Sequence, residues 1–197
     1  MKKILLFLSL CMISITGFCE DVVAYYKSEA STYQIEASEP KNGEFTYYIQ
    51  VQGEYKYNKV YMVLKSKDAD SFKESLNNIK SKYIEWCNVA KSNNITKLTK
   101  EFPFKLKLSY AWLGSKWWFS NTYVLTPKFQ ILNSDAGPQM YVSICKEAKA
   151  YDNEYIDQKT YLFLNSAEEI DTLISALDPK KVLDHYSSQK NKESLFE

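Results

Sequence analysis

The stretch 68-DADSFKESLNNIKSKYIEWCNVAKSN-93 decides the fold class of this 197-residue chain. Within it, apolar residues recur at alternating steps of four and three: Phe72, Leu76, Ile79, Tyr83, Trp86 and Ala90. This period places them on one side of an α-helix. The pattern therefore predicts one long amphipathic helix over residues 68–93, whose apolar side must be covered by another layer of the fold.

Alternating apolar and polar residues before and after this helix predict antiparallel strands that are buried on one side. Two early runs begin near Tyr33 and Phe45. The longest run has apolar residues at every second position: Phe104, Leu106, Leu108, Tyr110 and Trp112. Turn-forming sequences separate the apolar runs, so we expect most strands to be joined as hairpins.

A second, C-terminal helix is predicted over residues 167–177. Ser166 and Glu169 have the spacing of a capping box, and Pro179 interrupts the apolar pattern that follows. A short extra helical turn is expected through Tyr186, and the polar residues 188–197 are expected to form a flexible tail.

The strands that precede the two helices have similar sequences, YMVLKS at 61–66 and YLFLNS at 161–166. Each closes a run of about four strands. We therefore predict an α+β fold, in which an antiparallel sheet is built from a duplicated ββββα unit. The two pseudo-repeats would span residues 20–93 and 103–187 within a single globular domain, 20–187.

Residues 1–19 have the layout of a secretory signal peptide. Two lysines precede an apolar run of about a dozen residues, which is shorter than the roughly 20 that a membrane-spanning helix needs. Cleavage is expected after Cys19, which would export the protein to the periplasm or the extracellular space without a transmembrane span. The alternative, a lipid anchor on Cys19, is disfavoured because Phe18 occupies the place of a small residue.

Charge excludes several classes of partner. Without the two leader lysines, 23 basic residues face 24 acidic ones, a net charge of −1. Near-neutrality gives no electrostatic basis for binding nucleic acid or an anionic membrane. All the basic residues are lysine, so the bidentate fork that arginine offers to phosphate and carboxylate is absent.

Cys87 and Cys145 are the cysteines that remain after the leader. An exported protein can form disulfides, so these two define one possible pairing. The alternative is two buried free thiols, because the chain is long enough to build an apolar core without covalent help.

The segment 110–119 holds three of the four tryptophans and predicts a β-hairpin. A two-residue turn at Gly114-Ser115 would place Trp112 opposite Trp117 in the core, and Trp118 on the other face. Trp118, with Lys116 and Leu113, is the candidate contact for a ligand or partner. The alternative is that the long helix covers Trp118.

No catalytic residue, metal site or cofactor is predicted. His185 is the single histidine and has no partner at metal or triad spacing. Glu36, Glu44 and Glu54 fall on polar faces or in turns and are expected to be solvated. The acidic turn 152–154 lacks the spacing of a calcium-binding loop.

The leader, the stretch 60–104, the aromatic segment 111–119 and the turn 152–158 resemble uncharacterised secreted or periplasmic proteins of gut Bacteroidetes. The resemblance covers most of the chain after Val60. It implies an address in a Gram-negative envelope and carries no known activity.

Three functions remain open at this stage. The leading hypothesis is a non-enzymatic envelope module that binds a protein or a glycan through a sheet face or the Trp118 region. The second is a hydrolase of envelope or dietary polymers, which requires two carboxylates in a cleft. The third is a carrier of small hydrophobic molecules, which requires an internal apolar cavity.

Overall fold

The long helix predicted from the sequence forms as α1 (Ala69–Ser92) in the computed structural model, which describes residues 20–29, 31–54 and 59–193. A short 3-10 turn, η1 (Ser66–Asp68), leads into it. The apolar positions of the pattern are buried, apart from Trp86, which is half-buried and stacks on Phe102 with 4.9 Å between ring centroids. The predicted leader and its cleavage site lie outside the described residues.

Eleven strands are described, and they pair antiparallel into one sheet. The strands before α1 are β1 (Asp21–Ser28), β2 (Ser31–Ala37), β3 (Thr46–Gly53) and β4 (Val60–Lys65). Those after α1 are β5 (Leu98–Glu101), β6 (Leu106–Leu113), β7 (Trp117–Phe119), β8 (Tyr123–Leu125), β9 (Lys128–Ser134), β10 (Gly137–Lys149) and β11 (Asp157–Leu164). The α+β class is confirmed. The duplicated ββββα unit is not shown, since the second part of the chain has seven strands instead of four.

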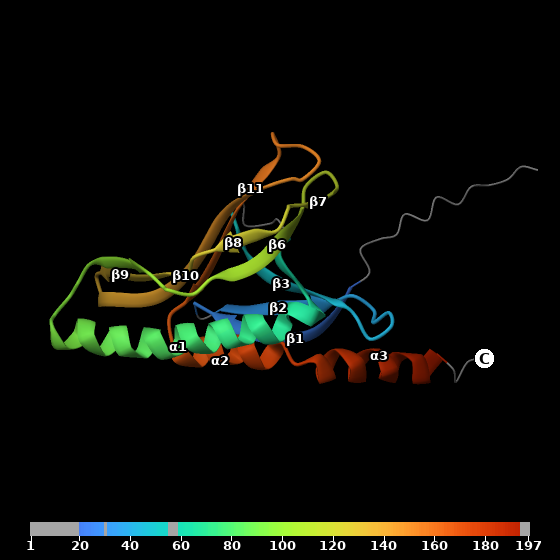
Figure 1. Cartoon of the computed structure of the whole chain (residues 1–197), viewed down its shortest axis with the longest axis horizontal. Helices are drawn as coiled ribbons and strands as arrows, with labels where there is room; N and C mark the ends of the chain where they lie inside the picture. The colour runs from blue at the N-terminus through green and yellow to red at the C-terminus, as the bar shows by residue number, and fades with distance from the viewer. Residues whose placement is uncertain (1–19, 30, 55–58, 194–197) are drawn as a thin grey trace, which may run out of the picture.

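Strand β3 is the branch point of the sheet. One edge of β3 pairs with β4 along residues 46–51, whereas the other edge pairs first with β2 and then, at Gln52 and Gly53, with β11. A Cβ atom on Gly53 would lie 2.7 Å from the Val60 side chain and 3.0 Å from Gln158, so only glycine fits where these strands crowd together. Beyond this point β10 and β11 diverge from β1 and β2 (Figure 1).

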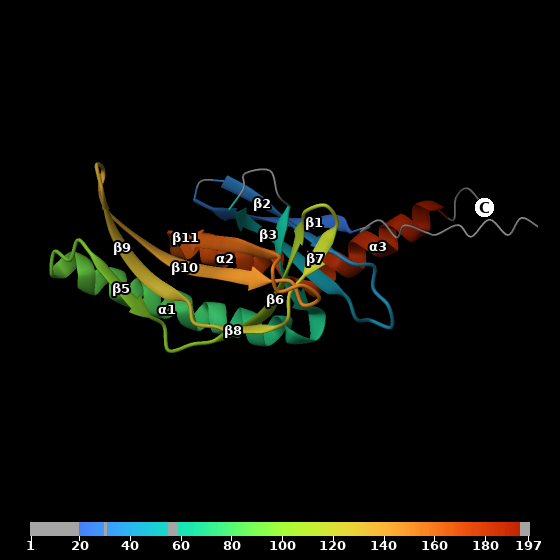
Figure 2. The ribbon, with the colours of Figure 1, turned by 90° about the horizontal axis from the view of Figure 1, so that it is seen from above.

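Helices α1, α2 (Ala167–Ala176) and α3 (Pro179–Glu193) lie on the same face of the sheet (Figure 1). The Tyr83 hydroxyl on α1 lies 2.9 Å from the Met140 carbonyl oxygen and 2.6 Å from that of Asn165, which fixes α1 against β10 and the end of β11. Seen from the sheet side, the strands cover α1 and α2 (Figure 2). We call the sheet face that points away from the helices the outer face.

The C-terminal helices form where the sequence predicts, with one difference. The Ser166 side chain accepts a hydrogen bond from the Glu169 backbone, which confirms Ser166 as the N-cap, and the Glu169 carboxylate accepts one from the backbone of Asn165, one residue before the N-cap. Helix α2 ends at Ala176, before Pro179, as predicted. Pro179 is the first residue of α3, a position that tolerates proline. The difference is that α3 is longer than the short turn expected through Tyr186: it continues to Glu193, so residues 188–193 of the expected tail are helical.

Side chains of α3 attach it to the start of the sheet or to the residues that follow β2: His185, Tyr186, Gln189 and Lys190. The Tyr186 hydroxyl donates a 2.6 Å hydrogen bond to the Ala37 carbonyl oxygen, and His185 Nε2 lies 3.1 Å from Asp21 Oδ2. His185, expected at the surface, is therefore half-buried in a structural pair. Within the described ranges, no helix combines the length and the apolar composition that a membrane span requires.

The packing of α1 on the sheet predicts a large effect of truncating its buried side. Leu76→Ala should lower the free energy of unfolding by about 2–5 kcal/mol, because Leu76 is fully buried and its removal leaves a cavity. Ile84→Ala, on the same helix but 45% exposed, should cost less than about 1 kcal/mol. Urea denaturation followed by circular dichroism measures both, and equal losses would contradict this packing.

Candidate functional site

The β6–β7 hairpin has a different register from the one predicted. Trp112 pairs with Trp118, and Leu113 pairs with Trp117, across a three-residue loop closed by a hydrogen bond from the Gly114 backbone to the Lys116 carbonyl oxygen. The predicted two-residue turn is therefore wrong. Because a shift of one residue exchanges the two faces of a strand, Trp118 moves to the side of Trp112 and Trp117 to the outer face.

Trp118 is half-buried against the apolar core. Its indole packs over Gly114, where a Cβ atom would lie only 3.1 Å from Nε1, and Lys116 Nζ sits 4.2 Å from the ring centroid. Lys116 also lies 3.5 Å from Asp152 Oδ2. The third predicted contact residue, Leu113, pairs with Trp117 and so lies on the outer face of the hairpin, opposite to Trp118. The structure therefore does not bring the three residues together on one surface.

The outer face instead carries a row of aromatic rings on adjacent strands. Tyr61 lies at its centre, with its ring centroid 6.2 Å from that of Tyr48 and 5.9 Å from that of Trp117. Its cross-strand neighbour on β6 is Ala111, whose small side chain leaves room for the rings. Ala111 in turn pairs with Phe119, which adds a fourth ring. Tyr61 is buried by its neighbours, whereas Tyr48, Trp117 and Phe119 are partly exposed.

A hollow of about 380 Å³, here called the outer hollow, opens beside this row where β3, β4 and β6 run side by side. Tyr48 and Phe119 line it, together with Val63 and Ser109, which pair across β4 and β6. The rest of the lining is mostly polar and includes two leucines: Thr46, Leu64, Lys65, Lys67, Asp68, Lys107, Leu108 and Thr122. The site thus places apolar rings, hydroxyl groups and ammonium groups around one cavity.

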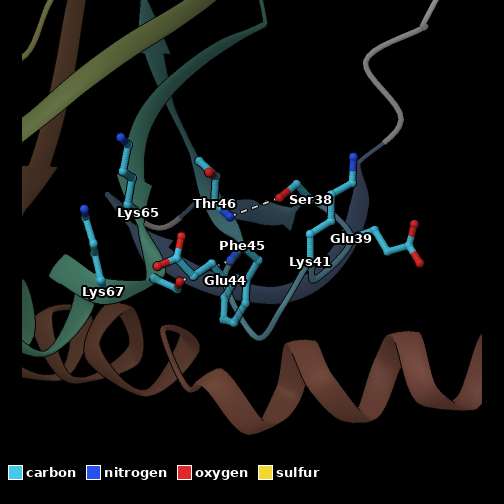
Figure 3. Close-up of a pocket in the computed structure, with 9 residues that line it drawn as sticks. Ser38, Glu39, Lys41, Glu44, Phe45, Thr46, Lys65 and Lys67 are labelled. Atoms are coloured by element: carbon cyan, nitrogen blue, oxygen red, sulfur yellow. Dashed lines mark hydrogen bonds between the residues drawn. The ribbon is translucent and has the colours of Figure 1, made fainter.

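A second hollow of about 530 Å³, the side hollow, lies next to the first and shares Thr46, Lys65 and Lys67 with it. Figure 3 shows Lys65 and Lys67 on one side of it and Lys41 and Glu39 on the other.

Hydrogen bonds fix the backbone at the junction of the two hollows. The Thr46 backbone donates to Ser38 Oγ at 3.0 Å, and the Phe45 backbone donates to Ser66 Oγ at 3.1 Å (Figure 3). The turn that precedes them is tight, because Asn42 and Gly43 both have positive φ angles, of 54° and 80°.

Two carboxylates lie next to the aromatic row. Glu36 is only 7% exposed, and Tyr61 donates a 2.7 Å hydrogen bond to its Oε1. The expectation that Glu36 is solvated is therefore wrong, because Tyr48 and Tyr61 cover the polar side of β2. Glu44 and Glu54 are exposed, as expected, and Glu54 pairs with Lys159 at 2.9 Å.

Glu20 is the second carboxylate of this cluster. Burial raises its pKa from 4.5 to about 7; a hydrogen bond with Tyr48 lowers the pKa in part, and the nearby charge of Glu36 raises it further. Its Oε2 atom is buried with no hydrogen-bond partner among the described residues. Glu20 therefore exchanges a proton near neutral pH.

Cys87 and Cys145 are both free thiols. Cys87 lies on α1, whereas Cys145 alternates with the buried Ile144 on β10 and points to the opposite face, so the sheet separates the two sulfur atoms. Burial raises the pKa of both thiols. Among the described residues, no group of three or more His, Cys, Asp or Glu side chains converges as metal ligands would.

Sequence reasoning named neither the outer hollow nor its aromatic row. One pattern in the sequence could have indicated the row. Tyr48, Tyr61 and Trp117 alternate with inward-facing apolar residues, so their rings lie on the face of the strands that usually carries polar side chains. Comparison with known proteins adds no identity, since no family model matches the chain and no curated protein or solved structure is significantly similar to it.

The buried position of Glu20 predicts a pH dependence of stability. The pKa of Glu20 is about 7 in the folded chain, against an ordinary value of 4.5. Between pH 4.5 and pH 7 the folded state therefore binds a proton at Glu20 that the unfolded state does not. The contribution of this proton to the unfolding free energy is fully present below pH 4.5 and is lost as the pH rises through 7. The unfolding free energy should therefore fall between pH 5 and pH 8, and Glu20→Ala should make this fall smaller. Urea titrations at both pH values measure it.

Glu74→Ala provides the matched control, because Glu74 is exposed on α1. That variant should keep the pH dependence of the unmodified protein. An equal fall in the Glu20→Ala variant would show that Glu20 is not the group responsible.

Proposed function

We propose that this protein is a non-enzymatic binding module of the cell envelope, which binds a glycan on the outer face of its sheet. The observation that carries this proposal is the outer hollow, which is lined by the rings of Tyr48 and Phe119 and by the Ser109 side chain. The envelope address rests on the predicted leader and on the resemblance of the sequence to exported proteins.

The chemistry of a sugar fits this arrangement. A pyranose ring has an apolar face of C–H groups, which packs on aromatic rings, and an edge of hydroxyl groups, which needs hydrogen-bonding partners. The Thr46, Ser109 and Thr122 side chains supply hydroxyls that make no hydrogen bond with another described side chain. The volume of about 380 Å³ lies at the lower end of the range for small-ligand pockets.

A hydrolase is the second candidate, because Glu20 and Glu36 form a carboxylate pair in which one member has a raised pKa. Such a pair can divide the roles of acid and base. Binding is better supported, since Glu36 is buried beneath Tyr61 and neither carboxylate lines the outer hollow or the side hollow.

Phe119→Ala should weaken glycan binding by about tenfold, which corresponds to about 1.4 kcal/mol, because it removes one of the two rings that line the hollow. The measurement is a screen of the protein on a microarray of neutral and acidic oligosaccharides, followed by isothermal titration calorimetry with the oligosaccharides that bind. Circular dichroism of the variant checks that it is folded.

Tyr155→Ala is the control, since Tyr155 is 87% exposed in the turn between β10 and β11 and is not among the residues that line the hollow. Its affinity should equal that of the unmodified protein. Failure to bind any oligosaccharide, or an equal effect of both substitutions, would contradict glycan binding at this site. Cleavage of a bound oligosaccharide, detected by mass spectrometry and abolished by Glu36→Gln, would establish the hydrolase instead.

A further inference from the structure

Three lysines line the outer hollow. The last residues that pair between β4 and β6 are Val63 and Ser109. Lys65 and Lys107 lie two residues beyond this pair on the two strands, on the same side as Val63 and Ser109 by the alternation of each strand. Lys67 follows in η1 and lines the same hollow. Positive charge is therefore concentrated at one end of the site, in a chain whose predicted mature net charge is −1.

This arrangement is electrostatically unfavourable in the absence of a ligand, because like charges that line the same hollow repel one another. Asp68 is the one acidic residue on the wall of the hollow. No ion pair within 4.0 Å joins Lys65, Lys67 or Lys107 to a carboxylate of the described residues. An anionic group in the hollow would relieve the repulsion between the three ammonium groups.

We propose that the outer hollow selects acidic glycans, seating a carboxylate or sulfate group between Lys65, Lys67 and Lys107 while the sugar ring packs on Tyr48 and Phe119. This inference rests on the proposed glycan-binding function and names the class of glycan. The absence of arginine is compatible with it, because an ammonium group attracts an anion as a point charge and needs no bidentate geometry.

The neighbouring side hollow is less suited to the anionic group. Its wall contains Glu39 and Glu44 in addition to Lys41, so acidic and basic side chains are mixed there. The hydroxyls of Ser109 and Thr122 also belong to the outer hollow and not to the side hollow. The anionic group and the sugar ring are therefore assigned to adjacent parts of one cavity.

Matched probes separate charge recognition from sugar recognition. Trigalacturonic acid and its methyl ester have the same three rings, but only the acid carries carboxylates. Isothermal titration calorimetry in 50 mM NaCl should give an affinity for the acid at least about tenfold higher than for the ester, and the difference should shrink at 300 mM NaCl, where charge interactions are more strongly screened. Sulfated and desulfated chondroitin hexasaccharides, compared in the same way, show whether sulfate is favoured as well as carboxylate.

The double variant Lys65→Ala/Lys107→Ala tests the assignment to the outer hollow. It should lose the preference for the acid while keeping the affinity for the methyl ester within about twofold, since the rings remain. The control is Lys180→Ala/Lys192→Ala on α3, which makes the same change of net charge on the helical side of the molecule and should keep the preference.

Three results would overturn this inference. Equal affinities for acid and ester, with binding of both, would leave glycan binding in place but remove the selection for acidic glycans. A triglutamate peptide that binds as tightly as trigalacturonic acid would show that the site recognises negative charge and not the sugar ring. That result would favour an acidic protein as the ligand. Failure to bind any of the saccharides would contradict both the selectivity and the glycan-binding function.

Discussion

Burial of the apolar side of α1 against the sheet is the constraint on which the rest of the structure depends. This side carries Phe72, Leu76 and Ile79, which are almost fully buried, and it requires a continuous apolar surface on the inner face of the strands. All three helices lie on that face (Figure 1). None of the described helices covers the outer face (Figure 1), so its side chains are covered by one another or are open to a ligand.

Side chains of the outer face cover one another in one part of the sheet and leave another part open. Where Tyr48, Tyr61 and Trp117 are neighbours, the rings cover one another and bury Glu36, whose charge is then stabilised by the Tyr61 hydroxyl. Towards the end of β4 the side chains change to threonine, serine and lysine, and the surface sinks into the outer hollow. The candidate site lies at this transition, because rings and polar groups are there within reach of the same small molecule.

The extent to which the sequence predicted these features depends on how local they are. The bounds of α1 and the N-cap of α2 follow from contacts within one or two helical turns, and both predictions are confirmed. The hairpin loop at Gly114 was predicted one residue too short, because a Gly-Ser turn suits either length. What selects the longer loop is the packing of Trp118 over Gly114 and against the core, which is a tertiary contact. The one extra residue in the loop therefore places Trp117, and not Trp118, on the outer face.

By itself, the sequence determined the fold class, the position of the long helix and, through the alternation within each strand, which residues of that strand share a side. Only the tertiary structure decided which outward residues become neighbours: Tyr61 with Glu36, and Tyr61 with Trp117. The physical reason is that alternation is a property of one strand, whereas neighbours across a sheet depend on strand order and register. Those are set by how all the strands together cover α1, and residues more than 40 positions apart in the chain thereby form one site.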